Sequence, residues 1–297
     1  MAMHVRARWG RWLATLPLLV LGCVLLAASG RADADSATSP IVEIERWLPL
    51  EGGGMKRVTV IVDTRVANAE QVLAEGYPHV VDTGGVTAQF ATFAKFAPQD
   101  VPVSVAYDNT GDPPGIDGEA NVTLAMDTWN EVPGQSFSFA LNGAPGVETP
   151  TCAGNFGDGV NTILFSNGLA PGILGETCTL FFLTVDGMSR IVEFDLHLSG
   201  STPWSDGPVT DDDTFDLPTV ILHELGHALG LDHSAHGSVM QPVLQPGTQL
   251  RKLTGDDIAG VLTLYGTGST PSPTPTPTAT VPATHPFRSM LGSLARD

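Results

Sequence analysis

The spacing of apolar residues along the chain predicts three helices. The first covers residues 120–131, where apolar side chains recur on one side. The second begins at Pro218, because proline suits the first turn of a helix. The third covers residues 254–265, and Thr254 can cap its N-terminus.

Other segments have the pattern of β-strands. Residues 101–107 alternate between apolar and polar positions. Residues 178–185 and 190–198 flank Asp186-Gly187, a turn signal typical of a hairpin. Shorter strands are predicted at residues 57–62, 137–141 and 160–165. The chain therefore mixes strands with helices, and residues 199–216 between them read as a polar loop.

The first 34 residues have the three parts of an export signal. A basic head precedes an apolar run from Leu13 to Ala28, and Ala32-Asp33-Ala34 matches a cleavage site. A retained N-terminal anchor and a lipoprotein modified at Cys23 are the alternatives. The run is short for a membrane span, so we expect removal of residues 1–34, secretion, and no stable membrane insertion afterwards.

The remaining chain divides by composition. Residues 35–95 are an N-terminal extension or a pro-segment, and residues 96–266 hold the clearest pattern. Residues 267–284 are a Thr/Pro-rich linker of polyproline type, and residues 285–297 are a short tail. Such a linker suggests association with a cell wall or cell surface.

Composition excludes some partners. The formal net charge is −18, with 14 Lys+Arg against 32 Asp+Glu. Nucleic-acid binding needs basic surface to meet phosphates, and docking on anionic lipid needs the same. We therefore expect no nucleic-acid partner.

Removal of residues 1–34 leaves two cysteines, Cys152 and Cys178. An even number of cysteines in an exported chain is compatible with a disulfide, which would contribute about 3 kcal/mol. Two separate buried thiols are the alternative.

The strongest chemical signal is the motif that begins at His223. His223 and His227 are four residues apart, so a helix places both imidazoles on one face. Gly230 permits a sharp turn, which returns His233 as a third ligand. Three neutral imidazoles with one open position are typical of a catalytic zinc site.

Glu224 follows the first of these histidines and can reach a zinc-bound water. Zinc lowers the pKa of that water towards about 7, so Glu224 can accept its proton as a general base and later return it as an acid. The alternative is an amphipathic helix whose histidines only make hydrogen bonds within the core and bind no metal. The full spacing of three histidines, one glutamate and one glycine is, however, highly specific for a zinc site.

The motif resembles that of the metzincin zinc endopeptidases, and within them the matrixins. Ser234 follows the third histidine, and residues 238–242 look like the Met-turn, with Met240 beneath the zinc. Residues 253–266 resemble the matrixin C-terminal helix. The resemblance spans about residues 97–266. It implies an α+β fold in which a twisted mixed β-sheet packs with an active-site helix and a C-terminal helix.

The resemblance also implies a protein or peptide substrate that lies extended along the sheet edge. It implies structural Ca²⁺ as well, for which oxygen-rich loops are suited. A solvated charge run is the alternative for the acidic loop that would hold it, which contains Asp206, Asp211, Asp212 and Asp213. Asp256 and Asp257 resemble an Asp pair that braces the Met-turn, although acidic residues also favour a helix N-terminus.

The chain departs from many animal matrixins in one respect. Their latency depends on a pro-segment cysteine bound to zinc, whereas residues 35–95 contain no cysteine. Latency, if it exists, must work otherwise. The leading hypothesis is a secreted zinc endopeptidase. A non-catalytic, zinc-stabilised surface binding module and a metal hydrolase for non-peptide substrates are the rivals.

Overall fold

The computed structural model describes residues 41–50, 54–68, 71, 92–143, 152, 157–182, 189–234, 237–242 and 244–267. The predicted export signal, most of the Thr/Pro-rich linker, the tail and the turn at Asp186-Gly187 lie outside these residues.

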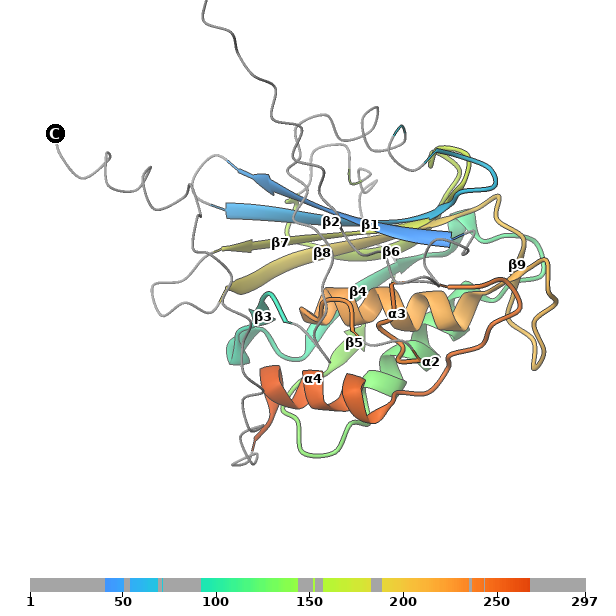
Figure 1. The fold of residues 1–297 in the computed structure, drawn as a ribbon. Helices are drawn as coiled ribbons and strands as arrows, with labels where there is room; N and C mark the ends of the chain where they lie inside the picture. Colours follow the sequence, from blue (N-terminus) through green and yellow to red (C-terminus); the bar gives the residue numbers. More distant parts are fainter. Residues whose placement is uncertain are drawn as a thin grey trace, which may run out of the picture.

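A twisted mixed sheet forms one layer of the molecule (Figure 1). Its strand order is β1-β2-β7-β8-β6-β4-β5, and the short β3 pairs in parallel with the first residues of β8. The strands are β1 Ile41–Pro49, β2 Gly54–Asp63, β3 Lys95–Phe96, β4 Val103–Asp108, β5 Phe139–Leu141, β6 Asn161–Ser166, β7 Ile173–Phe182 and β8 Arg190–Ser199.

The direction of the strands changes within the sheet. The pairs β5–β4, β4–β6 and β6–β8 are parallel, whereas the pairs β8–β7, β7–β2 and β2–β1 are antiparallel. β2 and β1, both from the N-terminal extension, therefore continue the same sheet beyond β7. Two short strands, β9 Trp204–Ser205 and β10 Phe215–Asp216, pair separately within the segment that was predicted as a loop.

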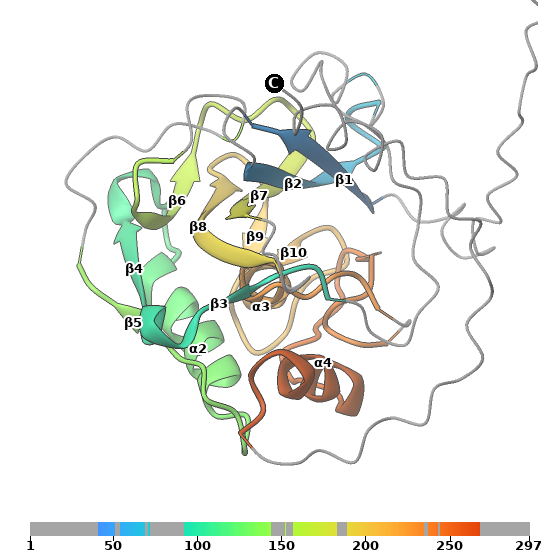
Figure 2. The same cartoon turned by 90° about the vertical axis from the view of Figure 1, so that its left-hand side faces the viewer.

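Within the part of the chain that the structure describes, three long helices lie on one face of the sheet (Figures 1 and 2). They are α2 Gly118–Asn130, α3 Leu217–Leu229 and α4 Gly255–Tyr265, which confirms the three predicted helices. Side-chain caps fix where they begin, because Asp117, Asp216 and Thr254 each accept a backbone N–H in the first turn. Among the residues described, no helix combines the length and the apolar character needed to cross a membrane.

The packing of the helices against the sheet places α3 at the centre of the molecule. Every residue of α3 is buried, which a helix enclosed by the sheet and two further helices requires. Trp129 of α2 is fully buried, and its indole N–H donates to the carbonyl of Leu222 in α3 at 2.9 Å. The two helices are thereby fixed relative to each other. The α+β architecture expected from the resemblance is confirmed.

Candidate metal centre

α3 carries the first two histidines of the motif into the molecular interior. His223 and His227 lie one turn apart, and both are buried. The helix ends at Gly230, whose φ of 100° only glycine adopts without strain. A Cβ at this position would lie 1.9 Å from the carbonyl oxygen of Ala94. The close approach and the turn both depend on glycine, and they return the chain so that His233 faces the helix.

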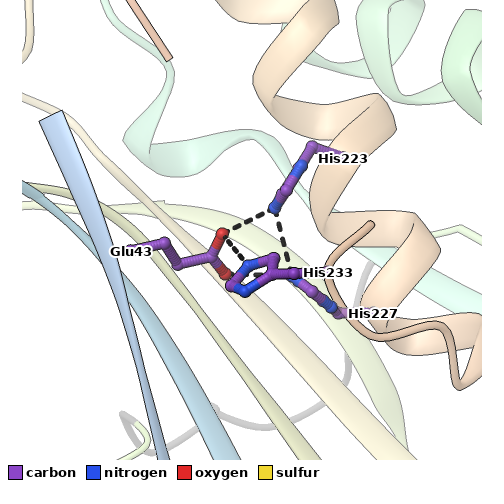
Figure 3. Close-up of side chains that lie close together, drawn as sticks. All are labelled: Glu43, His223, His227 and His233. Carbon is purple, nitrogen blue, oxygen red and sulfur yellow. Dashed lines mark hydrogen bonds and ion pairs between the residues drawn. The ribbon is translucent and has the colours of Figure 1, made fainter. Parts of the chain in front are cut away.

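The three imidazoles converge on one point (Figure 3). The Nε2 atoms of His223 and His227 are 3.1 Å apart, and the His233 ring centroid lies 5.0 Å from that of His227. Backbone carbonyls set the orientation of two rings. Nδ1 of His223 is 2.7 Å from the oxygen of Val239, and Nδ1 of His227 is 2.9 Å from that of Leu231. A proton on each Nδ1 leaves Nε2 free to bind a metal.

A carboxylate from the N-terminal extension completes this cluster. Glu43 of β1 places Oε2 2.7 Å from Nε2 of His223 and 2.6 Å from Nε2 of His233. Its Oε1 lies 2.9 Å from Nε2 of His227. Burial opposes ionisation of Glu43, but the three histidines hold its pKa well below the usual range.

These donors fit zinc. Each of the four side chains offers a ligand atom, and these atoms all lie within 4.8 Å of one another. Zinc prefers imidazole nitrogen and carboxylate oxygen at about 2.0–2.2 Å in a tetrahedron, whose edges are then about 3.3 Å. The nitrogen–nitrogen and nitrogen–oxygen distances of 2.6–3.1 Å are close to such an edge. His223, His227, His233 and Glu43 therefore form a cluster whose chemistry and spacing are compatible with a bound zinc ion.

Sequence reasoning missed Glu43. The motif that revealed the histidines depends on short spacings, whereas Glu43 precedes the first of them by 180 residues. Within residues 35–95 the sequence predicted a strand at residues 57–62, and it gave no sign of a metal ligand. The alternation of β1 is a local signal for a strand, but it does not indicate what that strand meets.

Glu224 lies in α3 beside the first histidine and is completely buried. Its Oε2 accepts a hydrogen bond from the hydroxyl of Thr177 in β7, while Oε1 has no hydrogen-bond partner among the described residues. Burial, together with the charge of Glu43, raises the pKa of Glu224 to about 8. A carboxyl with a free oxygen and a raised pKa is suited to exchange protons near neutral pH.

Met240 lies directly beneath this helix and is buried. Ser234 donates its N–H to the carbonyl of Met240 at 2.9 Å, which closes the loop after the third histidine. The carboxylate of Asp257 accepts the N–H groups of Val239 and Met240 at 3.1 and 3.2 Å. Asp257 of α4 thus holds the turn in place, as the resemblance implied.

The acidic loop does not gather into a comparable cluster. Among the residues described, neither of the two groups with metal-compatible geometry contains Asp206, Asp211, Asp212 or Asp213. The last three are exposed, and Asp206 accepts a hydrogen bond from the side-chain amide of Asn121 at 3.2 Å. Calcium binding by this loop stays a prediction from sequence.

Cys152 and Cys178 are joined in a disulfide. The bridge ties residue 152 to the middle of β7, and both cysteines are buried. His197 lies beside it, with Nδ1 3.0 Å from Glu176 and 3.9 Å from the sulfur of Cys152. Because the sulfurs are bonded to each other and not thiolates, this second metal-compatible group is not a zinc site.

Known proteins with similar sequences point to one class. Residues 183–266, which contain the three histidines and the Met-turn, match the model of the matrixin family. Metalloendoproteinase 1-MMP of Arabidopsis thaliana is 47% identical over 79 residues, which cover 24% of this chain and 21% of the relative. Stromelysin-1 of Mus musculus is 28% identical over 248 residues, which cover 80% of this chain and 44% of the relative. The hatching enzyme of Paracentrotus lividus is 28% identical over 234 residues, covering 78% and 35%.

The α+β fold and the cluster of three histidines agree with this similarity. Residues 183–266 thus resemble the matrixin family, and the proteins with similar sequences include metalloendoproteinases and stromelysin-1. The chain spans less than half the length of each of these curated relatives.

Proposed function

We propose that this chain is a secreted, zinc-dependent endopeptidase. His223, His227 and His233 would hold the zinc ion, and Glu224 would act as general base and acid. The observation that carries this proposal is the convergence of three imidazoles on one point (Figure 3), with the buried carboxylate of Glu224 on the helix that carries the first two histidines. The names of the similar proteins, which include metalloendoproteinases and stromelysin-1, support a peptide-bond substrate.

Bound zinc supplies a Lewis acid that polarises the scissile carbonyl and makes a nearby water acidic. Glu224 takes a proton from the water that attacks the carbonyl carbon and returns it to the nitrogen of the leaving amine. Thr177 orients the carboxylate through its hydrogen bond to Oε2. Because Oε1 has no hydrogen-bond partner among the residues described, it is the oxygen available for proton transfer.

The substrate would lie along β7. This strand is the last of those supplied by residues 96–266, so its outer side can pair with an extended peptide main chain. A cavity beside His223 is lined by apolar residues of α3 and of the segment after the Met-turn, including Val220, Leu244 and Leu250. It suits an apolar substrate side chain.

Export and surface association are part of this proposal. They rest on the basic head and apolar run within residues 1–34 and on the Thr/Pro-rich residues 267–284. N-terminal sequencing of protein recovered from culture medium tests the first, because the mature chain should begin after Ala34. Recovery of the protein only inside cells would contradict it.

The catalytic proposal is tested with Glu224→Gln, which preserves the size of the side chain. We expect this variant to bind one zinc per chain and, when both proteins are compared in the same form of the chain, to cleave casein at least 1000-fold more slowly than the wild-type protein. His227→Ala should lose the zinc as well as the activity. A variant that binds zinc and cleaves at the wild-type rate would disprove the role of Glu224. A zinc-loaded wild-type protein that retains peptides uncleaved would favour a binding module instead.

A further inference from the structure

The N-terminal hairpin of β1 and β2, residues 41–63, covers the edge of the sheet at which a peptide would bind. β2 pairs with β7 in antiparallel register from Gly54 opposite Phe182 to Val62 opposite Ile173. The pairing therefore spans the full length of β7. If the proposed function is correct, the hairpin takes the main-chain hydrogen bonds that an extended substrate needs.

The same hairpin reaches the metal centre through Glu43. The side chain of Glu43 is 3% exposed, and its two oxygens lie 2.6–2.9 Å from the Nε2 atoms of all three histidines. Figure 3 shows the carboxylate pointing from β1 into the space between the three rings. A catalytic zinc site needs one position open for water and substrate. Glu43 is placed to fill that position.

Arg57 of β2 fixes the hairpin to the loop that carries the third histidine. Its guanidinium is buried and pairs with Glu45 of β1 at 3.1 Å and with Asp232 at 2.8 Å. Asp232 also accepts the backbone N–H of His233 at 2.8 Å. The guanidinium carbon lies 4.5 Å from the ring centre of Phe93. A buried cation is stable only with its partners, so these contacts hold hairpin and site together.

Ile41 brings the hairpin into the cavity beside the metal centre. Ile41 and Glu43 are two residues apart on β1, so they point to the same face of the strand. Both line the cavity together with His223 and Leu250, and Ile41 is buried. The hairpin thus occupies the sheet edge, the metal centre and the adjoining cavity at once.

We propose that Glu43 is the fourth protein ligand of the zinc and that the hairpin of residues 41–63 keeps the enzyme latent until it is released. A glutamate carboxylate is an ordinary zinc ligand at about 2.0–2.2 Å. No cysteine is present in residues 35–95 to perform this role. Release of the hairpin frees the coordination position and the outer side of β7 together.

The test uses the full chain with Glu224→Gln as the parent, so that self-cleavage cannot remove the hairpin. Cobalt(II) replaces zinc because its visible absorption reports the ligands. Acetohydroxamate, a small metal-chelating probe, is then titrated into the parent and into the parent with Glu43→Ala. We expect Glu43→Ala to change the cobalt spectrum and to bind the probe at least 10-fold more tightly. Equal spectra and equal affinities would overturn the proposal.

Two further variants separate ligand loss from damage to the strand. Glu43→Gln keeps the size of the side chain but removes its charge, and it should also bind the probe more tightly than the parent. Arg46→Gln alters the opposite face of β1 and should behave as the parent does. If Arg46→Gln opens the site as far as the Glu43 variants, hairpin disruption and not ligation explains the effect, and the assignment of Glu43 is wrong.

Activity in chains with Glu224 intact distinguishes this proposal from the proposed function. The unprocessed Glu43→Ala chain should cleave a peptide at least 10-fold faster than the unprocessed wild type, with intact mass checked by mass spectrometry. Tighter probe binding by the Glu43→Ala chain, together with no cleavage even by protein from which residues 41–63 have been removed by proteolysis, would support ligation by Glu43 and disprove the peptidase. Cleavage at equal rates by both chains, with equal probe binding, would disprove latency and leave the peptidase standing.

Discussion

The sulfur of Met240 packs directly against Gly226, the residue before His227. A Cβ at position 226 would lie 2.2 Å from Sδ of Met240 and 3.1 Å from the ring of Trp129. Glycine is therefore needed at this helix position, although it lowers helix propensity. This contact fixes the position of the Met-turn relative to α3, the helix that carries His223 and His227.

Gly226→Ala should consequently destabilise the protein. The added methyl group overpacks the contact, and we expect a loss of about 1–3 kcal/mol in the free energy of unfolding. Urea denaturation measures it. Gly255→Ala in α4 is the matched control, because nothing lies within 4 Å of a Cβ there. If both variants are equally stable, the packing argument fails.

Asp216 should stabilise the folded protein by an amount that decreases as the pH falls. It caps α3 by accepting the N–H of Thr219, and it pairs with Arg251. Burial opposes its ionisation, but hydrogen bonds from Arg251 hold its pKa below the usual value. The unfolded chain thus binds the proton more readily, and the stabilisation present above about pH 4 is lost as pH falls through the folded pKa.

Asp216→Ala should accordingly lose about 2–4 kcal/mol at pH 7, since it removes a helix cap and leaves a partly buried arginine unpaired. The loss should shrink towards pH 3. Thermal melting of wild type and variant between pH 3 and pH 7 checks this. A difference that is constant over this range would contradict the assigned ion pair.

For Asp195 we expect the stability of the protein to depend on pH in the opposite direction. Burial, together with the charge of Glu193, raises the pKa of Asp195 to about 8, against smaller opposing effects of the Thr162 N–H and of Lys56. The folded state then holds a proton that the unfolded state releases near pH 4, so stability should fall as pH rises from about 4 to 8. Asp195→Asn removes this dependence and should be more stable than wild type at pH 9, on the order of 2 kcal/mol. Equal melting temperatures at pH 9 would refute the raised pKa.

The disulfide provides a prediction that does not involve the site. Cys152 and Cys178 are separated by 26 residues, so the bridge restricts a long loop of the unfolded chain. Replacing both with serine should cost about 3 kcal/mol in the free energy of unfolding. Urea denaturation with and without reductant provides the measurement, and the double variant should be insensitive to reductant. A reductant effect on the double variant would point to another cause.

Local patterns in the sequence predicted the helices and most of the site. The cap at Thr254, the glycine at position 230 and the spacing of His223 and His227 act over one or two turns. A helix therefore fixes their geometry wherever it lies. Strand positions were predicted less accurately. For example, β7 begins at Ile173, five residues before the predicted start at Cys178. The apolar residues at its beginning gave no alternation to mark it.

The sequence by itself determined that three histidines and one glutamate share a helix and the turn after it, because those relationships depend on spacing alone. Only the tertiary structure decided that Glu43 meets the same histidines and that Arg57 joins β2 to Asp232. Those contacts follow from the pairing of β2 with β7, strands more than 100 residues apart. Pairing between distant strands depends on the whole packed core, and no short pattern in the chain encodes it.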